Sequence, residues 1–138
     1  MKKMLCGLLV LILAMLPLQA LAEGWIEILP DITVTAVGTN TMATQAMIKA
    51  GADHVATGEN AVIVGARHAD IITGPVGIVI ADSLWGEITP NMALAIAQSS
   101  ARRILLPTNR CGSIIAGVED ASTAKLLQSA MDEIEKLL

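Results

Sequence analysis

The chain has 138 residues, of which 54% are hydrophobic, and this length suits one domain with a buried core but not two. It has no Phe, no Tyr and only two Trp residues, so Ile, Val, Leu, Met and Ala must build the core, as is typical of a parallel sheet between helices. The formal net charge is −4, and no basic cluster is larger than Arg102-Arg103, so we expect no nucleic-acid partner.

Residues 1–22 have the pattern of a secretory signal peptide. Lys2-Lys3 form a basic start, an uncharged apolar stretch follows, and Ala20-Leu21-Ala22 provide an A-x-A cleavage site. Cleavage after Ala22 would indicate export and would leave a single α/β domain over residues 23–138.

Two other interpretations of this segment stay open. The apolar run could be a buried first strand of the domain, or it could be a membrane anchor. A membrane span takes about 20 apolar residues, and Pro17 interrupts this run, so the anchor is marginal. Membrane contact is therefore expected only through residues 1–22.

Beyond residue 30 the sequence predicts alternating strands and helices. Ile32–Val37 is an apolar, β-branched strand, and Asn40 or Thr41 caps a helix that stops at Gly51. His54–Ala56 is predicted as a short strand. The apolar stripe of the helix is expected to comprise Ala43, Ala46, Met47 and Ala50.

The middle of the chain is less clear. Asn60–Ala66 could be a strand or a buried helical turn, and Val76–Ala81 is ambiguous in the same way. Asp70–Thr73 between them is predicted as a strand that ends at Gly74-Pro75.

The second half begins with a strong helix start, because the Thr89 hydroxyl precedes Pro90 at the first helical position. This helix should bury Met92, Ala95 and Ile96 and end at Ser99-Ser100. Strands are predicted at Arg103–Leu106 and Ser113–Val118. A last helix over 121–138 is indicated by apolar residues three and four positions apart: Ala124, Leu127, Met131, Ile134 and Leu138.

This alternation predicts a three-layer Rossmann-like α/β sandwich with a mainly parallel sheet. Four small, polar, glycine-marked loops follow its apolar runs, and ligands of open α/β sheets bind outside the carboxyl ends of the strands. Amides and hydroxyls there suit a phosphate, a ribose or another small polar ligand. The predicted ligand-binding residues are Gly38, Thr39, Asn40, Thr57, Gly58, Glu59, Asn60, Gly74, Pro75, Asn109, Arg110 and Cys111.

Other functions fit the same residues. Each loop could be only a turn or a helix cap, which would indicate a non-catalytic interaction module. A small enzyme could instead use Glu59 or Glu87 as acid or base, with Arg110 to fix an anion and Cys111 as a thiol. No hydrolase, Walker A or zinc-protease motif and no metal-ligand spacing is present, so the sequence supports no specific reaction.

The segments "GTN", "ATGEN", "GPVGIVIADSLWGEITP" and "LPTNRCG" resemble the distinctive segments of an uncharacterised bacterial family, the domain-of-unknown-function family numbered 3842, over residues 32–120. The resemblance implies a cytoplasmic Rossmann-like domain with a nucleotide or dinucleotide as cofactor. Family members typically open with a strand and a Gly-rich turn, but here only Gly7 and Gly24 precede Gly38. Either "LLVLIL" replaces the family's first strand, or the N-terminus is divergent. A homo-oligomer is left open.

Overall fold

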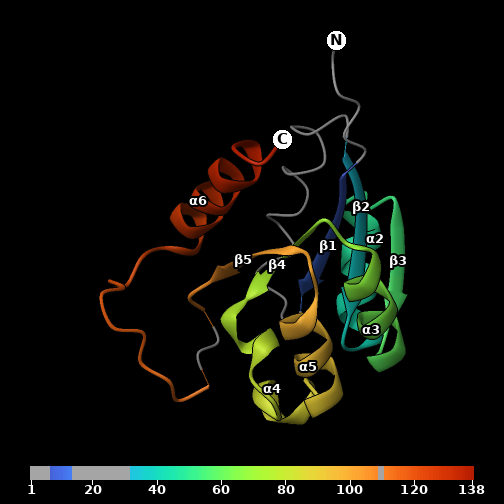
Figure 1. Ribbon diagram of the computed structural model, residues 1–138, viewed down its shortest axis with the longest axis horizontal. Coiled ribbons are helices and arrows are strands. Elements are labelled where there is room, and N and C mark those ends of the chain that lie inside the picture. The colour runs from blue at the N-terminus through green and yellow to red at the C-terminus, as the bar shows by residue number, and fades with distance from the viewer. Residues whose placement is uncertain (1–6, 14–31, 109–110) are drawn as a thin grey trace.

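A parallel sheet of five strands forms the centre of the domain (Figure 1). The structure is a computed structural model that describes the backbone of residues 7–13 and, in full, residues 32–108 and 111–138. The strands lie in the order β3-β2-β1-β4-β5, and each pair of neighbours is parallel. The mixed α/β class and the parallel strands expected from the sequence are therefore confirmed.

The strands are short, and their order differs from their order in the chain. Their bounds are β1 Gly7–Leu13, β2 Ile32–Gly38, β3 His54–Thr57, β4 Ile71–Pro75 and β5 Arg102–Leu106. The chain moves outward from β1 through β2 to β3, and then crosses to the other side of β1 to form β4 and β5.

β1 is the middle strand of this sheet. Leu9 of β1 is in register with Val34 of β2 on one side and with Ile71 of β4 on the other. Part of the apolar N-terminal run therefore forms a strand of the domain, which was one of the interpretations left open by the sequence. The predicted cleavage site at Ala22 lies outside the described residues, so the signal peptide stays a prediction.

Helices lie between successive strands from β2 to β5, and a further helix follows β5. They are α2 Thr41–Lys49, α3 Glu59–His68, α5 Pro90–Gln98 and α6 Thr123–Glu135, with a 3₁₀ turn at Val76–Val79 and a short turn, α4, at Ser83–Gly86. None of the helices in the described part of the chain is long and apolar enough to cross a membrane.

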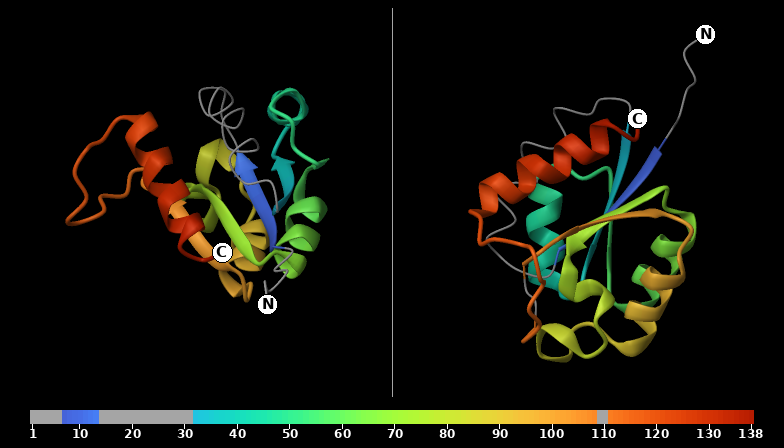
Figure 2. Two further views of the ribbon diagram at one scale, coloured as in Figure 1. Left: turned by 90° about the horizontal axis from the view of Figure 1, so that it is seen from above. Right: turned by 60° about the vertical axis from the view of Figure 1, so that its left-hand side comes forward.

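The helices cover the two faces of the sheet in pairs, α2 with α6 and α3 with α5 (Figure 2). Because side chains alternate along a strand, Ala36 packs with α2 and α6, whereas its neighbour Val37 packs with α3 and α5. Ile71 and Ile72 of β4 divide in the same way. The sheet therefore has a hydrophobic core on each side.

The capping residues are where the sequence placed them, whereas the apolar stripes agree only in part, since Ala93 of α5 is buried and the predicted Ala95 is half-buried. Asn40 caps α2 and accepts a hydrogen bond from the Ala43 amide at 2.9 Å, and Gly51 follows its end with a φ of 90°. Thr89 caps α5 ahead of Pro90. In α6 the buried residues are Leu127, Ala130, Met131 and Ile134, whereas the predicted stripe members Ala124 and Leu138 are exposed.

The predicted strand at Ser113–Val118 is wrong. This stretch forms turns on the outer side of the domain, between β5 and α6 (Figures 1 and 2). Ile114 is 92% exposed, and the Val118 amide bonds back to the Ile115 carbonyl instead of to a strand. Gly112 and Gly117, both with positive φ, bracket a segment that pairs with none of the described strands.

The bounds of one further strand are corrected, and two stretches that the sequence left ambiguous are resolved. β4 begins at Ile71, after Asp70, and extends through Gly74 to Pro75 instead of ending at Thr73. The two ambiguous stretches resolve into a helix, α3, and a 3₁₀ turn followed by irregular chain. α3 is helical because Val62 and Ala66, four residues apart, meet the sheet on one helix face.

Candidate functional site at the carboxyl ends of the strands

All strands point the same way, so the loops that follow β2 and β3 lie at one edge of the sheet. There they meet residues that lead into α5. We call the side chains joined at this edge the strand-end cluster: Thr39, Asn40, Glu59, Glu87, Thr89 and Asn91.

Glu87 is bonded to the loop after β2. The Thr39 hydroxyl donates to Glu87 Oε2 at 2.5 Å, and Asn40 Nδ2 donates to Glu87 Oε1 at 3.3 Å. Asn40 is also the N-cap of α2, whose first turn carries no acidic residue of its own. The Glu87 carboxylate therefore lies beside the positive end of the α2 dipole, where a negative charge is favoured.

Glu59 makes the second connection. It is the first residue of α3, and its carboxylate accepts hydrogen bonds from the Thr89 hydroxyl and, at 3.4 Å, from Asn91 Nδ2. Thr89 also caps α5, because its Oγ1 accepts from the Met92 amide at 3.2 Å. One carboxylate thus links the N-terminal ends of two helices that both favour negative charge.

The two predicted glycines of these loops, Gly38 and Gly58, are required by the local backbone structure. A Cβ on Gly38 would lie 2.3 Å from Thr44 Oγ1 and 2.9 Å from Thr44 N. Any residue larger than glycine at position 38 would therefore prevent α2 from packing this closely against the end of β2. The Gly38 carbonyl accepts from the Gly58 amide at 3.0 Å. Gly58 has a φ of 95° and a ψ of −179°, a conformation that is essentially restricted to glycine.

Hydrogen bonds between threonine side chains also join the loop after β2 to the loop after β3. The Thr44 and Thr57 hydroxyls lie 2.6 Å apart, and Thr44 Oγ1 also reaches the Asn40 carbonyl at 3.1 Å. The residues predicted from the first two loops are therefore joined, except Asn60, which is an exposed residue of α3.

The other two loops are placed differently. Gly74 and Pro75 are buried within β4, so they offer no surface to a ligand. Cys111 is exposed, and its Sγ accepts a hydrogen bond from the Leu84 amide at 3.4 Å, close in sequence to Glu87. Asn109 and Arg110 lie outside the described residues.

Sequence reasoning missed the role of Asn91. It treated Glu87 as an acid, a base or a residue before a cap, and Thr89 only as a cap. The available signal was local: polar residues cluster on both sides of Thr89-Pro90, from Glu87 to Asn91. Nothing local indicates that this cluster meets loops 30 to 48 residues away.

The cluster offers hydrogen-bond acceptors and donors but no metal site. Within residues 32–108 and 111–138, no group of three or more His, Cys, Asp or Glu side chains could hold a metal ion. Carboxylate oxygens can accept further hydrogen bonds from a ligand, and the Thr and Asn side chains can donate or accept.

The family model described as "Domain of unknown function (DUF3842)" matches residues 19–138. The chain belongs to the DUF3842 family. This confirms the resemblance carried by the quoted segments, and it brings no known activity with it. No curated protein matches the chain.

Among solved structures, this DUF3842 domain is similar to a crystal structure of a probable oxidoreductase from Mycobacterium abscessus, at 20% identity and a TM-score of 0.45. The match covers 95% of this chain and 40% of that chain, so the domain spans well under half of the longer protein. The whole strand-end cluster lies within the DUF3842 match, whereas β1 precedes it.

Proposed function

We propose that this DUF3842 domain is a three-layer Rossmann-like sandwich that binds a small polar or phosphorylated, nucleotide-like ligand at the carboxyl ends of its strands. The observation that carries the proposal is the all-parallel strand order β3-β2-β1-β4-β5. It is the order of the first five strands of the dinucleotide-binding fold, in which ligands bind where the order reverses. Here that point lies between β1 and β4.

We expect different residues to bind the hydroxyl groups and the phosphate of the proposed ligand. Glu59 and Glu87 accept hydrogen bonds, so they suit hydroxyl groups such as those of a ribose and would repel a phosphate placed beside them. A phosphate needs a cation and free amides. Arg110, predicted at the end of β5, is the cation that the sequence supplies for it.

The hydroxyl part is tested by comparing adenosine 5′-monophosphate with its 2′,3′-dideoxy analogue by calorimetry. We expect the ribonucleotide to bind more tightly, and Glu87→Gln to reduce that advantage, because an amide accepts hydrogen bonds more weakly than a carboxylate does. Glu133→Gln is the matched control, since Glu133 is an exposed glutamate on α6, away from the cluster.

The phosphate part is tested by Arg110→Ala. This change should abolish binding of the nucleotide while the melting temperature stays unchanged, because a charge-assisted hydrogen bond contributes about 1.5–3 kcal/mol. Native mass spectrometry of the purified protein should also reveal a co-purified small molecule. If no small molecule co-purifies, and neither nucleotide nor inorganic phosphate binds, the loops are only the turns of a small α/β fold.

A further inference from the structure

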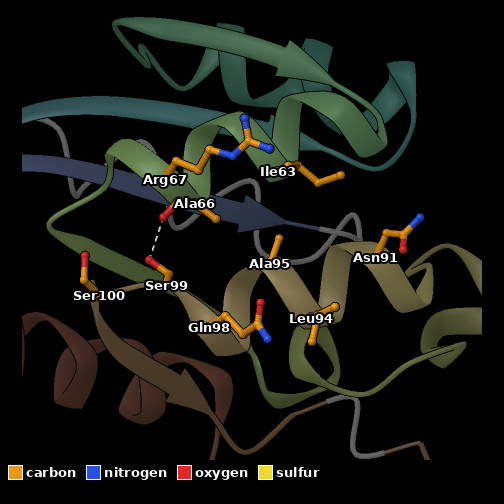
Figure 3. A pocket seen from close by; sticks show the side chains of 9 residues that line it. All are labelled: Ile63, Ala66, Arg67, Asn91, Leu94, Ala95, Gln98, Ser99 and Ser100. Carbon is orange, nitrogen blue, oxygen red and sulfur yellow. Dashed lines mark hydrogen bonds between the residues drawn. The ribbon is translucent and has the colours of Figure 1, made fainter.

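A groove runs along the outer side of the paired helices α3 and α5, and the proposed strand-end site does not account for it (Figure 3). Its volume is about 550 Å³, within the range of about 300–1,000 Å³ of small-molecule sites. The lining residues are Ile63, Ala66, Arg67, Asn91, Leu94, Ala95, Gln98, Ser99 and Ser100.

The middle of the groove is apolar. Ile63 and Ala66 line it from α3, and Leu94 and Ala95 line it from α5. The Leu94 side chain is 53% exposed, so covering it would remove further apolar surface from water, which is favourable in free energy. At one end the Ser99 hydroxyl donates to the Ala66 carbonyl at 2.6 Å and so joins the two helices (Figure 3).

The groove has one charged residue, and it is positive. Arg67 lies one helical turn beyond Ile63, and its side chain extends along α3 toward Ile63 (Figure 3). Within the described part of the chain, the Arg67 guanidinium has neither an ion pair nor a hydrogen bond. None of the other lining residues is an acid or a lysine, although the formal net charge of the chain is −4.

The two ends of the groove differ in charge. At the α5 N-terminal end, Asn91 donates to the Glu59 carboxylate at 3.4 Å, which makes that end unfavourable for an anion. Ser99 and Ser100 lie at the other end, and the Arg67 side chain extends from that side of the groove toward Ile63 (Figure 3). An anionic group is therefore favoured beside Arg67 and disfavoured beside Asn91.

We propose that this groove binds an amphipathic anion: a small molecule with one carboxylate, phosphate or sulfate group at Arg67 and an apolar chain or ring over Ile63, Leu94 and Ala95. The planar guanidinium can form two parallel hydrogen bonds to such a group. The apolar part covers the exposed surface of Leu94, which removes that surface from water.

Arg67 also has a role that needs no ligand, because it stands in the last turn of α3, where a positive charge complements the helix dipole. That role affects stability alone. The two are separated by measuring binding and melting temperature on the same variants.

The probe is octanoate, titrated into the ¹⁵N-labelled full chain and followed by amide chemical shifts. We expect shifts along α3 and α5, weaker ones with octanol and none there with octylammonium. Arg67→Gln should raise the octanoate Kd at least about tenfold, as expected for the loss of a charge-assisted contact. Leu94→Glu should also abolish binding, because it places a negative charge on the apolar wall.

The matched control is Arg102→Gln, which removes one exposed positive charge from β5 and should leave the octanoate Kd unchanged. The proposal is overturned if octanoate shifts no amide of α3 or α5, or if octylammonium binds as well as octanoate. It is also overturned if Arg67→Gln changes the melting temperature but not the Kd. None of these results depends on nucleotide binding at the strand ends.

Discussion

Replacing Gly38 by alanine tests how closely α2 approaches the end of β2. The added Cβ would lie 2.3 Å from Thr44 Oγ1 and 2.9 Å from both Thr44 N and the Asn40 carbonyl oxygen. The hydroxyl could rotate away, but the two backbone atoms belong to the cap and first turn of α2. The first turn of α2 must therefore shift away from the sheet.

Overpacking of this kind costs up to about 3 kcal/mol. Alanine recovers about 0.4–1 kcal/mol by restricting the unfolded chain. The net destabilisation is then about 2 kcal/mol, which lowers Tm by on the order of 5–8 °C in a domain of this size.

The measurement is urea and thermal unfolding of wild type, Gly38→Ala, Thr44→Ala and the double variant. Thr44→Ala alone should cost about 1 kcal/mol, since it loses the hydroxyl bonds to Asn40 and Thr57. The double variant should be more stable than the sum predicts, by at least about 0.5 kcal/mol, because the closest clash is removed.

The control is Gly117→Ala. Gly117 has a φ of 80° and no atom within 4 Å of an added Cβ, so alanine there costs only backbone strain and should not couple to Thr44. Wild-type stability of Gly38→Ala, or strict additivity with Thr44→Ala, would refute the close approach.

Three further predictions concern the fold. Leu127→Asp places an unpaired charge in a side chain that is 4% exposed, and it should destabilise the domain by several kcal/mol in urea unfolding; an unchanged midpoint would contradict the packing of α6. Arg103→Gln removes a guanidinium whose Nη1 donates to the Ser99 carbonyl at 2.7 Å, beyond the C-terminal end of α5, and should destabilise the domain by about 1–2 kcal/mol. Hydrogen exchange should rise first at that end of α5, and a uniform rise over the domain would argue against a role for this contact. Deleting residues 1–22 removes β1 and should abolish the cooperative unfolding transition followed by circular dichroism. A shortened chain that still melts cooperatively would show that the domain does not need this strand.

The parts of the fold that the sequence predicted are those with a local physical cause. Asn40 and Thr89 cap helices because their side-chain oxygens reach amides three residues on. Leu127, Met131 and Ile134 mark the buried face of α6 because their spacing follows the helical repeat.

The errors come from features that depend on neighbours in space. Ser113–Val118 has a strand-like composition, but a strand needs a partner, and none of the described strands pairs with this segment. Gly74 and Pro75 read as a loop, yet the pairing of β4 with β5 continues to Pro75 opposite Leu106. Proline is tolerated there because the pairing of β4 with β1 ends at Thr73, so position 75 lies beyond the hydrogen-bond ladder with β1.

The candidate site was predictable only in part. The loops after β2 and β3 were expected at one edge of the sheet, because parallel strands end together. The bonds of Glu87 to Thr39 and of Glu59 to Thr89 were not, since each joins residues that no local pattern relates. Gly38 was predicted as a ligand-binding residue, whereas the space beside it is filled by Thr44.

The central place of β1 also affects how the protein is made. Leu9 pairs with Ile71, so the sheet cannot close until the chain has been synthesised 62 residues beyond Leu9. At about 5–20 residues per second, this delay lasts on the order of 3–12 s. Throughout it the nascent chain carries the apolar segment behind Lys2-Lys3 that the sequence predicts to be a signal peptide. If this segment acts as the predicted signal peptide, folding and targeting compete for the same residues, because β1 lies within it.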